Sequence, residues 1–130
     1  RFAPRVGKSV KAVFDTNILI DYLNGIEDAK IELAKYSIRQ ISVISLIEVM
    51  VGATSAVEEN AIRSFLGTFE ILELSGEIAS QAIAIRKQYR LKIPDAIVYA
   101  TARTQGCMLV SRNTKDLKQE WPDIRIPYQI

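Results

Sequence analysis

Short apolar runs alternate with segments of helical periodicity along most of this 130-residue chain, and this alternation limits the fold more than any other feature. Short runs bounded by turn residues suit buried strands, whereas apolar residues spaced three and four apart suit amphipathic helices. The expected strands are 10–14, 41–44, 70–74, 107–111 and a last one near 124–128. The expected helices are 16–24, 27–36, 46–53, 56–66, 76–90 and 94–105. This order predicts a three-layer α/β/α fold with a mainly parallel central sheet, which binds ligands at the carboxyl ends of its strands.

The chain is expected to form one domain over residues 10–130. With 48% hydrophobic residues it can bury a substantial core. Residues 1–9, RFAPRVGKS, lack periodicity and contain Pro4 and Gly7, which favours a flexible arm or a remnant of cloning. No apolar run has the length of a membrane helix or the character of a signal peptide, so we expect a soluble protein of the cytoplasm.

Composition excludes several kinds of catalytic site. The chain has no histidine and one cysteine, Cys107, which rules out catalytic triads that need histidine and zinc sites that need several cysteines. Catalysis must therefore use carboxylates, whose oxygen ligands favour Mg²⁺ or Mn²⁺. The net charge of +2 arises in residues 1–11, because residues 12–130 carry 13 basic and 15 acidic side chains. An argument for nucleic-acid binding must therefore be local rather than global.

Two acidic residues follow expected strands, where a parallel sheet binds its ligands. Asp15 comes directly after strand 10–14, in the stretch VFDTNILID. Asp116 follows strand 107–111 after a short loop, in SRNTKD. Charged side chains are rarely buried unless they are paired or bound to a metal, so Asp15 in particular is a candidate metal ligand.

Two further acidic residues lie near the starts of expected helices. Glu48 interrupts the apolar stretch SVISLIEVMVGA, in the first turn or two of a helix entered from strand 41–44. Asp95 follows Pro94, and proline is a favoured first residue of a helix.

Each acid also has a purely structural interpretation. Asp15 could cap the helix that follows it, and Asp95 could simply complement a helix dipole. Glu48 could be one exposed glutamate on a mostly buried helix. Asp116 could lie in its loop for conformational reasons alone.

Three stretches together resemble the PIN-domain ribonucleases, and most closely the VapC-like toxins of toxin-antitoxin pairs. They are VFDTNILIDYL, ISVISLIEVMVGA and IPDAIVYATARTQGCMLVSRNTKDL, and they occur in the order and at about the spacing of that family. The resemblance spans nearly all of residues 11–130. Leu117 departs from it, because phenylalanine is usual there.

The resemblance implies a site and a function. By position, Asp15, Glu48, Asp95 and Asp116 would form an acidic pocket that holds Mg²⁺ or Mn²⁺ and hydrolyses RNA phosphodiester bonds as an endonuclease. Thr16, Ser111 and Asn113 match the polar residues that accompany these acids. A homodimer and a VapB-like antitoxin partner are also implied. The number of metal ions and the RNA that is cut remain open.

Functions from other classes fit less well. A receiver domain expects an acidic pair after the first strand, where Asp15 stands alone, and a phospho-acceptor after the third strand, where the sequence reads ELSG. A phosphatase of the haloacid-dehalogenase type needs a second aspartate at the position of Asn17. The alternative that stays open is a PIN domain that binds RNA or a protein without cutting.

Overall fold

The computed structural model describes residues 10–130, and within them a five-stranded sheet has the strand order β3-β2-β1-β4-β5. All neighbouring strands are parallel. The strands are β1 Lys11–Phe14, β2 Ile38–Ser42, β3 Glu70–Leu72, β4 Met108–Val110 and β5 Ile124–Arg125. The helices are α2 Thr16–Leu23, α3 Glu27–Ala34, α4 Val43–Val51, α5 Ala56–Leu66, α6 Gly76–Tyr89 and α7 Ile93–Gln105. The predicted mainly parallel sheet is confirmed.

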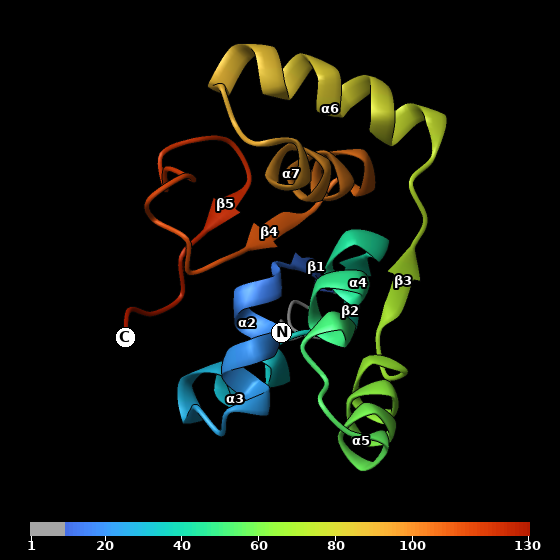
Figure 1. The fold of residues 1–130 in the computed structure, drawn as a ribbon. Coiled ribbons are helices and arrows are strands. Elements are labelled where there is room, and N and C mark those ends of the chain that lie inside the picture. Colours follow the sequence, from blue (N-terminus) through green and yellow to red (C-terminus); the bar gives the residue numbers. More distant parts are fainter. Residues whose placement is uncertain (1–9) are drawn as a thin grey trace.

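Helices cover both faces of the sheet and give the expected three layers (Figure 1). On one face α7 packs on the strands, with α6 outside it. On the other face lie α2, α3 and α5. The central strand β1 serves both cores because successive side chains of a strand point to opposite faces. Val13 packs with the α6 and α7 side, whereas Ala12 and Phe14 pack with the other.

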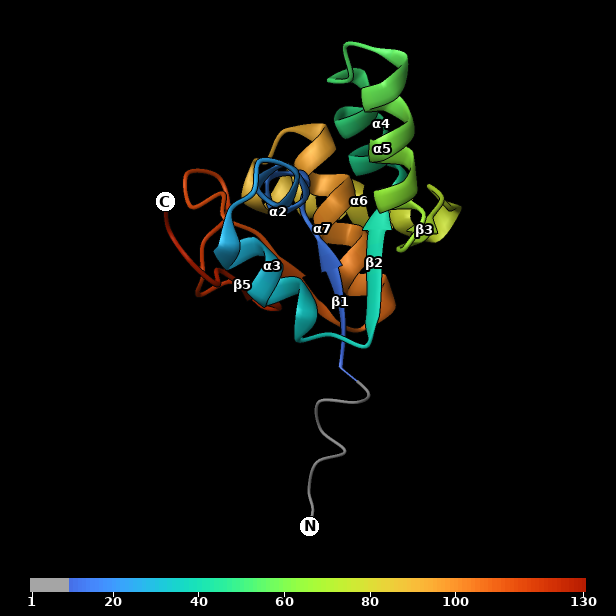
Figure 2. The ribbon, with the colours of Figure 1, turned by 90° about the horizontal axis from the view of Figure 1, so that it is seen from below.

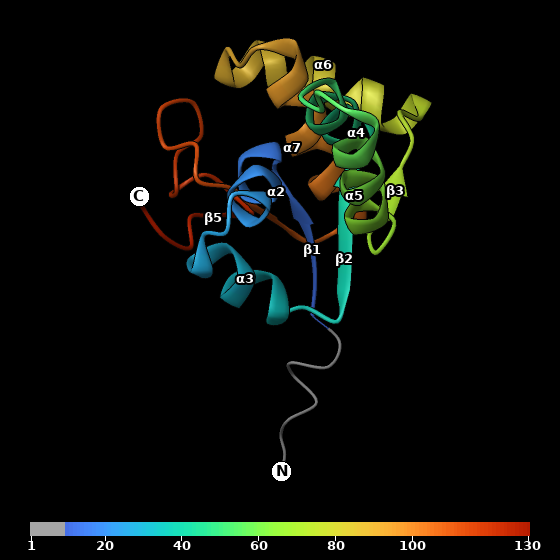
Figure 3. The same cartoon turned by 60° about the horizontal axis from the view of Figure 1, so that its bottom comes forward.

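The chain reverses direction after each strand near the same edge of the sheet. Figures 2 and 3 show β1 and β2 side by side in the same direction, with α2 and α4 beginning beyond their ends. Val13 is in register with Gln40 of β2 and with Leu109 of β4. The carboxyl ends of these three strands therefore lie next to one another.

Most helix boundaries agree with the sequence prediction. Gly25, just beyond the end of α2, and Gly106, which ends α7, have φ angles of 81° and 67°, a backbone conformation that favours glycine. The helix predicted over 56–66 has those bounds.

The transition from the second strand to its helix was predicted wrongly. The expected strand 41–44 and helix 46–53 are β2 Ile38–Ser42 and α4 Val43–Val51. Ser42 ends the strand because its hydroxyl accepts a hydrogen bond from the Ile44 backbone and so caps the helix. An apolar run without glycine or proline does not reveal this change of periodicity.

The remaining strands are shorter than predicted, and β5 comprises only Ile124–Arg125 of the expected 124–128. The expectation of a flexible arm at residues 1–9 lies outside the described residues. In the described part of the chain, no helix combines the length and the apolar character needed to cross a membrane.

Candidate active site

The candidate site lies where the strand order changes direction. Chain connections run from β1 outward to β2 and β3 on one side and to β4 and β5 on the other. In open parallel sheets the crevice at such a switch point is the usual ligand site. Asp15 follows β1 directly and occupies this position.

Asp15 is 6% exposed and is held by three neighbours. One carboxylate oxygen, Oδ1, accepts a 2.8 Å hydrogen bond from the Thr16 backbone N–H at the start of α2. The other, Oδ2, accepts from the hydroxyl of Ser111 at 2.7 Å and from Asn17 Nδ2 at 3.4 Å. Burial and the nearby charge of Glu48 raise the pKa of Asp15, and the hydrogen bonds oppose this rise.

Glu48 lies in the second turn of α4 and is tied to α2. Thr16 Oγ1 donates a 2.5 Å hydrogen bond to Glu48 Oε1 and also lies 2.9 Å from Ser45 Oγ. A carboxylate cannot donate, so the single hydroxyl proton of Thr16 goes to Glu48, and Ser45 supplies the proton of the second contact. Thr16 thereby orients an otherwise exposed glutamate.

Asp95 lies in the first turn of α7 and is partly buried. Its pKa is raised to about 6, first by burial and then by repulsion from Asp15, Asp116 and Glu48, while Lys92 opposes the rise. All four predicted acids are thus close enough to interact electrostatically.

Asp116 is held by the loop after β4. Its Oδ2 accepts a hydrogen bond from Asn113 Nδ2 at 3.2 Å, and its backbone N–H donates to Asn113 Oδ1 at 3.2 Å. The Asn113 backbone N–H in turn donates to Ser111 Oγ at 3.0 Å. The loop thus links Asp116 to the hydroxyl that binds Asp15.

A hollow of about 370 Å³ brings most of the predicted residues together. It is lined by Asp15, Thr16, Asn17, Ile20, Glu48, Asp95 and Asn113. Three of the four acids therefore line it, and Asp116 does not, although it is bonded to Asn113, which does. Within residues 10–130, no three acidic or cysteine side chains are gathered closely enough to ligate one ion.

The donors of this hollow nevertheless suit a hard cation. They are carboxylate, hydroxyl and amide oxygens, the ligands that Mg²⁺ and Mn²⁺ prefer. In the described part of the chain, no lysine or arginine forms an ion pair with Asp15, Glu48 or Asp95. Burial is the main cause of the raised pKa of Asp95, and repulsion from Asp15, Asp116 and Glu48 adds to it.

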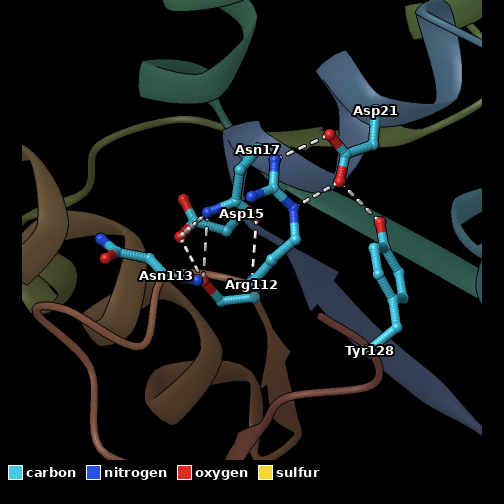
Figure 4. A network of polar contacts seen from close by, with 7 residues as sticks. Asp15, Asn17, Asp21, Arg112, Asn113 and Tyr128 are labelled. Atoms are coloured by element: carbon cyan, nitrogen blue, oxygen red, sulfur yellow. Dashed lines mark hydrogen bonds and ion pairs between the residues drawn. The ribbon is translucent and has the colours of Figure 1, made fainter. Parts of the chain in front are cut away.

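Two other buried acids differ from the site acids because each has an arginine partner. Asp21 of α2 is paired with Arg112 and Glu32 of α3 with Arg125, both with an N–O distance of 2.6 Å. Figure 4 shows that the Asp21 pair is connected to Asp15 through Asn17, whose side chain bonds both the Arg112 backbone and Asp15. Among the buried acids of residues 10–130, only Asp15 has no ion-pair partner.

Sequence reasoning overlooked Asn17 as a site residue. Asn17 bonds Asp15 and Ser111 through Nδ2, and its Oδ1 accepts the backbone N–H of Arg112 at 3.0 Å. Its position in DTN, at the start of a helix that follows a strand, was the available signal. The pairing of Asp21 with Arg112, 91 residues apart, had no sequence signal.

The comparisons with known proteins agree with this architecture. The PIN domain profile matches residues 12–119. A chain of a toxin-antitoxin complex from Klebsiella pneumoniae is 44% identical, with a TM-score of 0.86, and the match covers 92% of this chain and 99% of that chain. A comparison with curated proteins gives no match.

Two less similar structures share the fold. One is a VapBC complex from Rickettsia felis bound to a promoter DNA fragment, at 20% identity and a TM-score of 0.74, covering 92% of this chain and 98% of that chain. The other is a DNA-bound VapBC complex from Salmonella typhimurium, at 22% identity and a TM-score of 0.72, with the same coverage. At these identities the likeness shows the fold alone.

Proposed function

This chain belongs to the PIN-domain family, and from that premise we propose that it is a ribonuclease dependent on Mg²⁺ or Mn²⁺ and the toxin of a toxin-antitoxin pair. The observation that most supports this proposal is a group of acids at the switch point of the sheet that form no ion pair with any lysine or arginine of residues 10–130. Their repulsion contributes to a pKa of about 6 at Asp95. A bound divalent cation would relieve that repulsion.

The four acids differ in their burial and in the neighbours that hold them, so we assign them different roles. Asp15 and Asp95 would bind the metal directly, because both are at least partly buried and both face the hollow. Glu48 would complete the set of ligands or orient water, with its direction set by Thr16. Asp116 would act similarly, with its direction set by Asn113.

The polar neighbours keep the acids ready for binding. Ser111, Asn17 and the Thr16 N–H donate hydrogen bonds to Asp15, which stabilise its charged form against burial. A Mg²⁺ or Mn²⁺ ion would lower the pKa of a coordinated water and neutralise charge on the reacting phosphate. Asp95, with a pKa of about 6 in the metal-free protein, would be held in its charged form by a bound cation.

An antitoxin partner is supported by the 44% identical chain, whose structure is described as a toxin-antitoxin complex. We propose that this chain also binds an antitoxin, of the VapB-like kind, and that it acts on RNA in the cytoplasm as a homodimer. Sedimentation of the purified chain alone and with its antitoxin would measure both assemblies.

The proposed activity is tested by incubating the purified protein with short fluorescent RNAs at rising Mn²⁺ concentrations. Cleavage should require the metal and should vanish in Asp15→Asn and Asp95→Asn. Glu73→Gln, which changes an exposed acid after β3, is the matched control and should cleave normally. Metal-independent cleavage, or full activity of both aspartate variants, would contradict the proposal. RNA binding without cleavage would favour the non-cleaving alternative.

A further inference from the structure

Two ion-pair clamps of nearly the same chemistry tie the C-terminal part of the chain to the helices on one face. We call them the Arg112 clamp (Asp21, Arg112, Tyr128) and the Arg125 clamp (Glu32, Tyr36, Arg125). Nε and Nη2 of Arg112 donate to Asp21 at 2.6 and 2.8 Å, and the Tyr128 hydroxyl donates to Asp21 at 2.9 Å.

The Arg125 clamp repeats this geometry at a different place. Nε and Nη2 of Arg125 donate to Glu32 at 2.6 and 2.9 Å, and the Tyr36 hydroxyl donates to Glu32 at 2.7 Å. Both carboxylates are buried, at 4% exposure for Asp21 and 2% for Glu32. Similar stability contributions are therefore expected from the two clamps.

The two clamps meet the acid site differently: the Arg112 clamp bonds the side chain of Asn17, whereas the Arg125 clamp meets the site through the Arg125 backbone carbonyl, which accepts the Ser111 N–H at 3.0 Å and is kept when the Arg125 side chain is changed. Arg112 stands between Ser111, which donates to Asp15, and Asn113, which binds Asp116. Its own backbone N–H donates to the side chain of Asn17, as Figure 4 shows. The residue thus holds α2 at two points, through its backbone at Asn17 and through its guanidinium at Asp21.

These two points lie on one face of α2, because residues four apart in a helix are neighbours. Asp21 therefore anchors the loop after β4 one helical turn beyond Asn17. A bidentate arginine fork fixes direction as well as distance, which a single hydrogen bond does not. With the fork in place, Ser111 Oγ is held 2.7 Å from Asp15 Oδ2.

We propose that Arg112 is a positioning residue, which uses its fork on Asp21 to keep Ser111 and Asn17 bonded to Asp15. Arg112 itself touches no reacting atom in this role. The proposal rests on the proposed function only in so far as Asp15 binds a metal. A direct contact of Arg112 with the RNA phosphate would be a different role. It is less favoured because two guanidinium nitrogens of Arg112 already bind Asp21.

The test compares matched variants of the two clamps. Asp21→Asn and Arg112→Lys break the fork of the first clamp, and Lys keeps the charge. Glu32→Gln and Arg125→Lys are the corresponding changes in the second. Five quantities are measured for each: stability in urea, Mn²⁺ affinity by electron paramagnetic resonance, kcat for RNA, KM for RNA, and metal-free hydrogen exchange at the backbone amide of Asn113.

We expect both Arg112-clamp variants to bind Mn²⁺ about 10- to 100-fold more weakly, as is typical when the support of a metal ligand is lost. The Asn113 amide should exchange faster, because its acceptor Ser111 is no longer held. The losses of Mn²⁺ affinity caused by Asp21→Asn and by Arg112→Lys should be less than additive when the two substitutions are combined. The Arg125-clamp variants should lose stability and keep the Mn²⁺ affinity and Asn113 exchange of the parent.

Two results would overturn the positioning role. A raised KM in Arg112→Lys with parental Mn²⁺ affinity in Asp21→Asn would assign Arg112 to RNA contact. Equal losses of Mn²⁺ affinity in both clamps, in proportion to lost stability, would make the Arg112 clamp merely structural. If the parent binds no Mn²⁺, the proposed function fails, and the Asn113 exchange rates alone decide on the clamp.

Discussion

At the scale of single residues, Asp15 shows that a structural and a functional interpretation of one side chain can both hold. Its Oδ1 does accept the first N–H of α2, as a capping residue would. Its Oδ2 is held by Ser111 and Asn17, which come from different parts of the chain. A cap alone needs only local partners. The additional, distant partners indicate that the orientation of this carboxylate matters.

Asp95 provides the first prediction, which concerns pH and stability without metal. Its pKa rises from 3.8 to about 6 on folding, so the ionised form destabilises the folded protein. The cost is absent below about pH 4 and complete above about pH 6. Asp95→Asn should therefore be more stable than the parent at about pH 8, by about 1–2 kcal/mol after allowance for solvent screening, and not at about pH 4.

Urea denaturation of the metal-free proteins at both pH values measures this difference. Glu73→Gln is again the control and should show no pH-dependent gain. An Asp95→Asn variant that is less stable at both pH values would mean that the charge of Asp95 mainly complements the dipole of α7.

At the scale of secondary-structure elements, the site depends on side chains that join α2, α4 and the loop after β4. Thr16 is the link between α2 and α4, because its hydroxyl contacts both Ser45 and Glu48. Ser42 determines where α4 begins and therefore which direction Glu48 points. A strand extended to residue 44, as predicted from sequence, would have turned Glu48 to a different side of the helix.

Thr16→Val should weaken catalysis while keeping the fold, because valine has the shape of threonine without the hydroxyl. A hydrogen bond to a charged group contributes about 1.5–3 kcal/mol, so kcat/KM for RNA should fall by about 10- to 100-fold. Thr16→Ser keeps the hydroxyl and should retain most of the activity. Equal losses in the valine and serine variants would show that the methyl group, and not the bond to Glu48, is what matters.

The Arg125 clamp, which joins α3 to β5, predicts a contribution to acid stability. Although burial alone would raise it, the hydrogen bonds from Arg125 hold the pKa of Glu32 at about 2, below its ordinary value of 4.5. The stabilisation is complete above about pH 4.5 and is lost as pH falls through about 2. Glu32→Gln should therefore cost about 2–3 kcal/mol at neutral pH, and the difference from the parent should shrink steadily below about pH 4.5.

Urea midpoints between about pH 3 and pH 7 would follow this difference. Ser75→Ala, which removes a surface helix cap with no titrating group, is a suitable comparison. Its deficit should not change with pH. A Glu32→Gln deficit that is equally independent of pH would show that packing, rather than the ion pair, carries the contribution of Glu32.

At the scale of the whole molecule, the acids of the candidate site differ from the other buried acids in the charges that lie near them. Asp21 and Glu32 are buried acids whose arginine partners come from the C-terminal part of the chain. Asp15 and Asp95 meet other acids instead. These acids would therefore attract a cation from outside the protein, either a metal ion or the guanidinium of another molecule.

This suggests how a proposed antitoxin would inhibit. An arginine placed among Asp15, Glu48 and Asp95 would form charge-assisted bonds to carboxylates and replace the charge of the metal. Inhibition by the cognate antitoxin peptide should therefore weaken as Mn²⁺ rises, with the apparent inhibition constant increasing about tenfold for each tenfold of Mn²⁺ above its dissociation constant. RNA cleavage at several fixed Mn²⁺ concentrations measures this dependence.

Peptides with each arginine replaced by alanine identify the residue responsible. Loss of both affinity and Mn²⁺ dependence in one peptide would support charge replacement. Inhibition that does not change with Mn²⁺ concentration, together with unchanged affinity of every alanine peptide, would mean that the antitoxin only blocks the access of RNA.

Much of the fold and of the candidate site was determined by local features of the sequence. The alternation of apolar runs and helical segments predicted the parallel sheet, because periodicity follows from how a strand or a helix buries one face. The order of strands and helices placed Asp15 at the carboxyl edge, since the residue after a parallel strand must emerge there. Histidine-free composition limited the chemistry to carboxylates without reference to structure.

Tertiary structure alone decided which charges have partners. Asp15, Asp21 and Glu32 are all acids near apolar segments, and nothing in the local sequence tells which of them has an arginine partner. Arg112 and Arg125 stand more than 90 positions away from the acids that they neutralise. A side chain is stabilised by the charges within a few ångströms of it, and those distances exist only once the sheet has brought β4 and β5 beside β1.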